Sequence, residues 1–198
     1  MSARLLLATR NAHKVREFGR LLPGLELDPL PEDVVTPPES GTTYAENALI
    51  KARAAAHATG RAAIADDSGI EAAALNGAPG VRTARYAGEQ ATDAENLAKL
   101  GREAPAGTTL RYVCVIAHVE PDGSEHLFQG TTDGTVAPEP RGSGGFGYDP
   151  LFVPDDTGHD TRTMAELSDA EKDAISHRGR AARAFEEWLT GMRELLNR

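Results

Sequence analysis

The sequence predicts an α/β protein in which strands and helices follow one another along the chain. Short apolar runs at residues 5–8 and 63–65 have the continuous hydrophobicity that is typical of buried strands. Apolar residues recur at helical spacing after residue 11 and again near the C-terminus. Ser/Thr-x-x-Glu capping boxes, which open helices, begin at Thr43, Thr92 and Ser168.

The first strand, residues 4–9, leads directly into a helix that Asn11 can cap and Pro23 ends. Such a helix N-terminus offers free backbone N–H groups and the positive end of the helix dipole to an anion. Polar and basic side chains crowd the junction, namely Thr9, Arg10, Asn11, His13 and Lys14. The spacing of a Walker loop is absent, so the junction predicts either an anion site or a polar helix cap with solvated basic side chains.

Residues 25–42 are rich in Pro, Glu and Thr and predict a long loop, in which Glu39 has no evident structural role. The next helix begins at the capping box of Thr43 and Glu46, so Glu46 is first a capping residue and only second a metal ligand. Lys51 falls off the alanine stripe of this helix, where a lysine is ordinarily solvated.

Residues 63–65 run straight into Asp66, Asp67, Ser68 and Gly69. This pattern predicts a buried strand that stops at a sharp turn and delivers carboxylates to the rim of a sheet. Neighbouring carboxylates repel each other in an apolar site, and Mg²⁺ would remove that cost by taking their oxygens as ligands. From this stretch alone, a surface turn is equally compatible with the residues.

The middle of the chain predicts a loop at residues 75–80, a helix opened by Thr92, and two strands at residues 110–119 and 126–136. A Pro-Asp-Gly turn joins these strands as an antiparallel pair. Arg82, Arg85 and Tyr86 precede that helix and either face solvent or meet a ligand. The last helix has apolar residues at helical spacing from Phe185 onward, which favours core packing or a subunit contact.

Residues 142–150 combine four glycines with Phe146, Tyr148 and Asp149. Glycine lets a backbone approach a ligand closely, and aromatic faces stack on planar bases, so this segment predicts a ligand-contacting loop rather than a flexible linker. The helix capped by Ser168 carries Lys172, and His177 and Arg178 are expected at its end, close to Lys172.

Composition narrows the class of protein. The 198 residues suit one domain or two closely apposed lobes. A formal net charge of −9 argues against nucleic-acid binding through a broad basic surface. The single cysteine, Cys114, lies in an apolar run, which excludes a disulfide within the chain and a cysteine-rich zinc site. The sequence shows no signal peptide or membrane span, so we expect a cytoplasmic protein without a membrane partner.

Together these residues predict a nucleoside triphosphate site. Glu39, Asp66 and Asp67 offer oxygen ligands for Mg²⁺. Cationic groups suited to phosphates and their surroundings come from Lys14, Lys51, Lys172 and Arg178. The chemistry favoured by this set is metal-assisted phosphoryl transfer to water, which a carboxylate activates.

Motifs along nearly the whole chain resemble the inosine/xanthosine triphosphate pyrophosphatases, which remove noncanonical purine nucleotides. The matching segments, in family order, are residues 7–14, 39–48 with 51–53, 65–69, 77–80 with 84–86, 144–150 and 172–179. Each segment is a weak signal by itself, and the ordered set is highly specific. Arg10 departs from the pattern, because many members have glycine after the threonine.

The resemblance implies an elongated, two-lobed α/β fold with a long curved mixed β-sheet flanked by helices and an active-site cleft between the lobes. Residues 1–198 would form a single domain without a separable linker. Family members require Mg²⁺, typically form homodimers, and hydrolyse ITP, dITP or XTP to the monophosphate and pyrophosphate.

By the same resemblance, Asp67 would be the general base and a metal ligand, Glu39 the second metal carboxylate, and Asp66 a support for the metal shell. The residues implied to contact substrate are Thr9, Arg10, Asn11, Ala12, His13, Lys14, Lys51, Ser68, Phe146, Gly147, Tyr148, Asp149, Lys172, His177 and Arg178. Inosine and xanthosine carry a carbonyl at C6, and donors around His177 and Arg178 would favour it over the amino group of adenine.

Two other functions are compatible with parts of the sequence. A pyrophosphatase for other modified nucleotides, as in the Maf-like proteins, fits the acidic residues but not the segments 146–149 and 176–178. A nucleotide sensor without turnover fits the cationic residues, yet triphosphate binding alone gains little from adjacent carboxylates.

Overall fold

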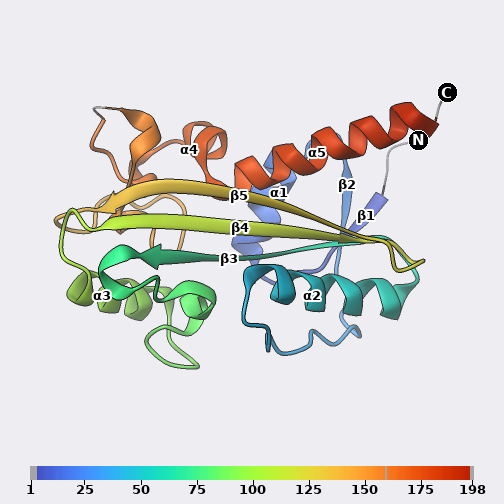
Figure 1. Cartoon of the computed structure of the whole chain (residues 1–198), viewed down its shortest axis with the longest axis horizontal. Coiled ribbons are helices and arrows are strands. Elements are labelled where there is room, and N and C mark those ends of the chain that lie inside the picture. Colours follow the sequence, from blue (N-terminus) through green and yellow to red (C-terminus); the bar gives the residue numbers. More distant parts are fainter. Residues whose placement is uncertain (1–3, 159, 197–198) are drawn as a thin grey trace. The chain divides into compact units, whose positions relative to one another are not determined.

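The computed structural model describes residues 4–158 and 160–196, and it confirms the α/β class (Figure 1). Within these residues a six-stranded sheet has the strand order β2-β1-β3-β4-β5-β6. Strand β1 pairs in parallel with β2 and β3, whereas β5 and β6 are antiparallel, so the sheet is mixed. The strands are β1 Arg4–Leu7, β2 Glu26–Pro29, β3 Ala63–Ala72, β4 Thr109–Val119, β5 Glu125–Val136 and β6 Phe152–Pro154. The α-helices are α1 Ala12–Leu21, α2 Tyr44–Thr59, α3 Asp93–Glu103, α4 Asp169–Ile175 and α5 His177–Leu196.

The chain divides into two compact units. Unit 1 comprises residues 1–67, 114–130 and 178–198, and unit 2 comprises residues 68–113 and 131–177. The strands β3, β4 and β5 each contribute residues to both units, and each unit has a hydrophobic core of its own.

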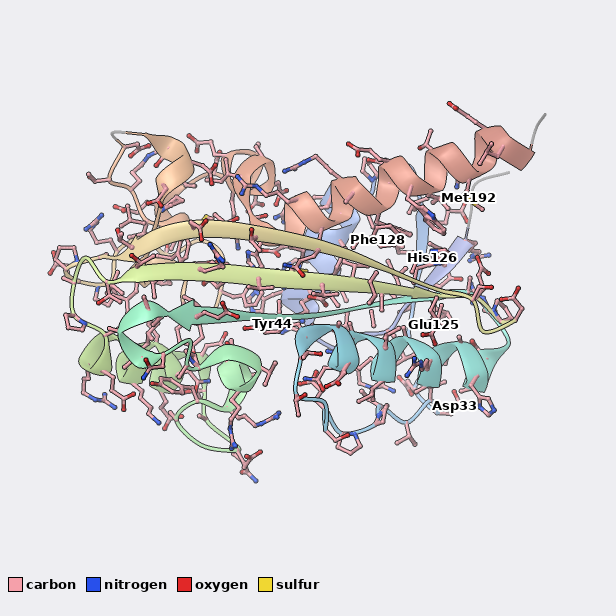
Figure 2. All side chains as sticks on the ribbon, viewed as in Figure 1. Asp33, Tyr44, Glu125, His126, Phe128 and Met192 are labelled. Carbon is pink, nitrogen blue, oxygen red and sulfur yellow. The ribbon has the colours of Figure 1, made fainter. Side chains whose placement is uncertain are left out.

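Unit 1 is a sheet segment with helices on both faces (Figure 1). Leu6, Ala63 and Ala65 pack with the alanines of α2, whereas Leu5, Leu7 and Ile64 pack with α1 and α5 on the other face. This alternation follows from the two-residue period of a strand, and it explains why Leu5–Leu7 and Ala63–Ala65 are apolar on both faces. Phe128 of β5 lies on the α5 side of the sheet (Figure 2). The centroid of its ring is 5.3 Å from that of Phe185.

Unit 2 is built around one core cluster. Ile70 and Ala72 of β3, Leu110 and Tyr112 of β4, and Leu100 of α3 are buried in it. The same cluster includes Tyr148, Leu151 and Phe152, so the glycine-rich segment 142–150 leads into packed structure. The capping boxes of Thr92 and Ser168 open α3 and α4 as expected.

Three expected boundaries are wrong. The strand expected to stop at Asp66 continues to Ala72, so the acidic pair lies inside β3 and not at a turn. Residues 26–29 form the edge strand β2 within the expected loop, because pairing with β1 outweighs the low strand propensity of that segment. His177 and Arg178 begin α5 and do not end α4, because Ser176 takes an extended conformation that separates the two helices.

The apolar face of α5 is buried only in its first half. Phe185 is fully buried, whereas Leu195 is 65% exposed. The side chain of Leu196 lies outside the described part. Cys114 is buried as expected.

Candidate functional site

The acidic pair sends its two carboxylates to opposite faces of β3. Because side chains alternate along a strand, Asp66 shares the face of Ile64, which packs with α1 and α5, and Asp67 shares the face of Ala65, which packs with α2. Both side chains are buried. Two residues that are adjacent in sequence therefore meet different partners.

On the α2 face, Asp67 and Glu39 share one ammonium group. The Nζ atom of Lys51 lies 2.6 Å from Glu39 Oε1 and 3.5 Å from Asp67 Oδ1. Asn47 donates a hydrogen bond from Nδ2 to Asp67 Oδ2 at 3.1 Å. Lys51, which the sequence placed off the alanine stripe, is buried in this cluster rather than solvated.

The electrostatics of this cluster are balanced around Lys51. Burial alone would lower the pKa of Lys51, but the carboxylates of Asp66, Asp67 and Glu39 outweigh burial and raise it. Burial raises the pKa of Asp67, the Lys51 charge opposes that change, and Glu39 adds to it, so the pKa stays above its ordinary value. The two carboxylates of this cluster, Glu39 and Asp67, thus need the positive charge of Lys51 to lie close together.

Hydrogen bonds tie the loop that follows Glu39 to the start of α2. Thr43 and Glu46 form the predicted capping box, and Glu46 also accepts the backbone N–H of Thr42 at 2.6 Å. Gly41 donates its N–H to Asn47 Oδ1 at 2.8 Å. A Cβ atom at Gly41 would lie 2.6 Å from the Cβ of Glu46, so only glycine lets the loop approach the helix this closely.

On the opposite face, Asp66 lies in a buried network of charges. Its Oδ2 atom is 2.9 Å from Lys14 Nζ and 3.1 Å from Arg178 Nη2, and Arg178 Nη1 is 2.5 Å from Glu17 Oε2. Burial would raise the pKa of Asp66, but Lys14 and Arg178 outweigh it and hold that pKa well below its usual range. In this network the Oδ2 atom of the Asp66 carboxylate is paired with cations of the chain itself.

The predicted anion junction has the geometry of a capped helix start. Asn11 caps α1 by accepting the backbone N–H groups of His13 and Lys14, while its own N–H is 3.2 Å from Thr9 Oγ1. The Arg10 guanidinium donates to the carbonyl oxygens of Pro31, Glu32 and Val34. Arg10 therefore holds the loop after β2 through its side chain.

In unit 2, Asp149 is the centre of a second cluster. Its Oδ2 atom accepts from Lys172 Nζ at 2.7 Å and from the backbone N–H of Phe146 at 2.9 Å, and its Oδ1 atom accepts from Tyr112 Oη at 3.1 Å. Gly145 has a φ of +66°, and a Cβ atom there would clash with the Asp149 carboxylate. The glycine is required because the segment folds back over this carboxylate.

Aromatic rings surround the Asp149 cluster. The ring of His177 stacks on that of Tyr112 with centroids 4.4 Å apart and planes 8° apart. Lys172 Nζ lies 5.2 Å from the centroid of Phe146. Two further contacts hold the segment, from Tyr148 Oη to the carbonyl of Thr83 at 2.8 Å and from Gly147 N–H to Asp93 Oδ2 at 3.2 Å.

The predicted site residues therefore fall into three groups. Unit 1 brings together Glu39, Lys51 and Asp67, and separately Lys14, Asp66 and Arg178. Unit 2 brings together Phe146, Asp149, Lys172 and, through Tyr112, His177. Arg178 does not join the unit-2 cluster of its neighbour His177, since its partners are Asp66 and Glu17. Ser68, half-buried in β3, belongs to unit 2, and Ala12 and His13 lie exposed in the first turn of α1.

Sequence reasoning missed three residues of these groups, Asn47, Glu17 and Tyr112. Asn47 stands one residue after the capping glutamate, on the face toward β3, and Glu17 lies three residues after Lys14 on α1. A polar residue beside a predicted core position, as Glu17 is beside Phe18, is the signal that could have found such groups. Tyr112 gave no comparable signal within its apolar strand.

No three His, Cys, Asp or Glu side chains in the described ranges come together as a metal-binding group. The same ranges hold no helix with the length and apolar character needed to cross a membrane.

Comparison with known proteins shows a close similarity over most of the chain. The model of the Ham1 family matches residues 5–188. A dITP/XTP pyrophosphatase of Cutibacterium acnes is 48% identical over 196 residues, which cover 92% of this chain and 94% of the relative. The dITP/XTP pyrophosphatase of Symbiobacterium thermophilum is 50% identical over 188 residues, 92% of this chain and 93% of the relative. A solved HAM1 protein from Coxiella burnetii aligns with a TM-score of 0.84 and 43% identity, covering 96% of this chain and 99% of that structure.

Proposed function

The chain belongs to the Ham1 family, and from this premise we propose that it hydrolyses noncanonical purine nucleoside triphosphates, dITP and XTP among them, to the monophosphate and pyrophosphate. The observation that carries the proposal is the cluster of Glu39, Lys51 and Asp67, in which two buried carboxylates share one cation. Such a cluster suits a substrate that brings both negative phosphates and a metal ion.

In this reaction the oxygen of a water molecule bonds to the α-phosphorus while the bond from that phosphorus to the bridging oxygen breaks. Asp67 accepts the proton of the water, a role for which its raised pKa is favourable because the carboxylate then holds a proton more readily. Lys51, Lys14 and the N-terminus of α1 are assigned to the phosphate charges. The pyrophosphate leaves with the bridging oxygen.

Mg²⁺ is the proposed metal, and the residues present fit it. Glu39 and Asp67 supply hard carboxylate oxygens that already lie around a single cationic atom, Lys51 Nζ. The Oδ1 atom of Asp66 is buried without a hydrogen-bond partner, which leaves one further oxygen on the neighbouring residue for the surroundings of the metal. When bound, the ion would neutralise phosphate oxygens and favour ionisation of water.

The base is assigned to the unit-2 cluster. Phe146 offers an aromatic face, and Lys172 and His177 supply nitrogen atoms of the kind that can donate to a C6 carbonyl. An amino group at C6 would leave such donors without partners, which disfavours adenine. Arg178 is assigned to the Asp66 network rather than to the base, because both of its carboxylate partners are buried with it in unit 1.

A kinetic comparison of four substrates tests the proposal. Pyrophosphate release from dITP, XTP, dGTP and dATP is measured with Mg²⁺, then after chelation of the metal, and then with the metal restored. We expect kcat/KM for dITP and XTP to exceed that for dATP by about tenfold or more, since one unpaired buried donor costs about 1–3 kcal/mol. A parallel preparation of Asp67→Asn controls for contaminating activity.

Each outcome bears on a separate part of the proposal. If no substrate released pyrophosphate, the proposed activity would be wrong. Equal kcat/KM for all four substrates would contradict the proposed selectivity. Full activity after chelation would contradict the proposed requirement for a metal ion.

The proposal includes a homodimer acting on the nucleotide pool of the cytoplasm. Its support is the likeness of residues 7–14, 65–69 and 144–150 to a family whose members typically form dimers. Light scattering after size-exclusion chromatography tests the dimer, and a mass of one chain, 21.0 kDa, would contradict it.

A further inference from the structure

Tyr112 links His177, which the proposed function assigns to the base, to Asp149, the carboxylate that holds Lys172 and Phe146. It is a buried residue of β4, and its hydroxyl donates to Asp149 Oδ1 while its ring stacks in parallel on His177. Asp149 in turn holds Lys172 and the backbone of Phe146 through its other oxygen, Oδ2. Tyr112 thus contacts His177 and Asp149 directly, and it reaches Lys172 and the Phe146 backbone through the Asp149 carboxylate.

We propose that Tyr112 is a positioning residue for purine recognition, which sets the plane of the His177 ring by stacking and the orientation of the Asp149 carboxylate by hydrogen bonding. The inference rests on the proposed function, since it assigns the cluster to the base.

The hydroxyl group is the part of Tyr112 that core packing does not explain. The ring also lies 4.5 Å from that of Phe152 and belongs to the core of unit 2, a role that phenylalanine would fill equally well. The hydroxyl instead occupies the one oxygen of Asp149 that Lys172 and Phe146 leave open. A carboxylate with donors on both oxygens has a fixed orientation, and Lys172 and the Phe146 backbone are fixed with it.

The variant Tyr112→Phe separates the two roles, because it keeps the ring and removes only the hydroxyl. We expect KM for dITP to rise about tenfold, as for the loss of one hydrogen bond to a charged group, with kcat changed by less than about twofold. Inorganic tripolyphosphate, which has phosphates but no base, serves as a competitive inhibitor whose inhibition constant should stay unchanged. Tyr112→Leu removes the stacking as well and should raise KM for dITP further.

Tyr86→Phe is the matched control. Its hydroxyl also donates to a carboxylate, that of Glu103, within unit 2, but its ring does not stack on His177. We expect this variant to keep the wild-type KM for dITP. Thermal unfolding of all variants shows how much stability each change removes.

The outcomes distinguish this inference from the proposed function. An unchanged KM for dITP in Tyr112→Phe, or an equal rise of KM for dITP and of the inhibition constant for tripolyphosphate, would overturn the positioning role while wild-type activity stands. A drop in melting temperature with unchanged kinetic constants would show that Tyr112 is a core residue only. An inactive wild-type chain would overturn the proposed function, and the role of Tyr112 in base recognition with it.

Discussion

The two units build their clusters from different interactions. In unit 1, carboxylates meet cations, as Asp66 meets Lys14 and Arg178 and as Glu39 and Asp67 meet Lys51. In unit 2, a single carboxylate, Asp149, is surrounded by one lysine, one hydroxyl, one backbone N–H and stacked rings. The first kind of cluster suits a ligand whose charge is large and whose shape is variable, and the second suits a flat ligand with a fixed pattern of donors and acceptors.

Within unit 1, the neighbouring residues Asp66 and Asp67 also differ in how their charges are paired. Asp66 has its cations within the chain, whereas Asp67 shares Lys51 with a second carboxylate and has a raised pKa. The Asp66 carboxylate, whose Oδ2 atom is paired with two cations, contributes to the folded state, whereas a carboxylate that shares one cation is available to a ligand. Neutralising each carboxylate in turn should therefore give opposite results.

The largest expected effect is on catalysis in Asp67→Asn. This change removes the proposed proton acceptor and one metal carboxylate, so we expect kcat to fall by about 10²–10⁴-fold. The fold should be retained, because asparagine occupies the same volume and repels Glu39 less. Pyrophosphate release and thermal unfolding measure the two properties. A kcat within threefold of the wild type would remove Asp67 from the reaction.

Asp66→Asn should act mainly on stability. The change leaves buried Arg178 and half-buried Lys14 without their shared carboxylate, and removing one partner of a buried ion pair costs about 3–5 kcal/mol. Urea unfolding of Asp66→Asn beside Asp67→Asn measures the difference directly. Equal free energies of unfolding for the two variants would contradict the separation of their roles.

Two lysines test the comparison between the units. Lys172→Met should raise KM for dITP about tenfold, because it removes one cation from the Asp149 cluster, and should leave the inhibition constant of tripolyphosphate near the wild-type value. Lys51→Met should weaken both ligands, since Lys51 lies with the residues assigned to phosphates. If both variants weakened the binding of tripolyphosphate to the same extent, the assignment of phosphates to unit 1 and of the base to unit 2 would be wrong.

The sequence predicted the elements of the fold better than the grouping of the candidate site residues. Capping boxes and apolar spacing are local, so the starts of α2, α3 and α4 and the apolar strands followed directly from the residues. The turn predicted at Asp66 and Asp67 was wrong. Asp, Ser and Gly favour turns, and the pairing of β3 in the sheet overrides that preference. Once Asp66 and Asp67 lie in a strand, alternation alone puts them on opposite faces.

Contacts between residues from distant segments could not be predicted from the sequence. Glu17 and Arg178 are 161 residues apart, and Tyr112 reaches Asp149 across 37 residues, so no local pattern links them. The same holds for His177 and Arg178, which are adjacent in sequence yet begin α5 with different partners. The direction of each side chain at the start of a helix depends on the elements against which the helix packs. A sequence motif gives no information about that packing.

At neutral pH the smallest expected effect concerns a second buried histidine, His118, whose surroundings differ from those of His177. His118 of β4 is buried in unit 1, with its ring 5.2 Å from that of Trp188 and 6.4 Å from that of His126. Neither ring nitrogen has a hydrogen-bond partner, and Glu120 Oε1 lies 3.5 Å from Nε2. Burial, with a smaller contribution from His126, lowers the pKa of His118 to about 4.

This lowered pKa predicts that His118 affects stability and not binding. In the unfolded chain His118 takes up a proton below about pH 6.5, whereas in the folded chain it stays neutral down to about pH 4. Stability should therefore be full above about pH 6.5 and fall as the pH drops toward 4, by at most about 1.4 kcal/mol per pH unit, with Glu120 reducing the slope. His118→Phe should flatten this dependence in urea unfolding and keep the wild-type KM for dITP, whereas His177→Phe should raise KM. A pH slope that is unchanged in His118→Phe would assign the acid sensitivity to other groups.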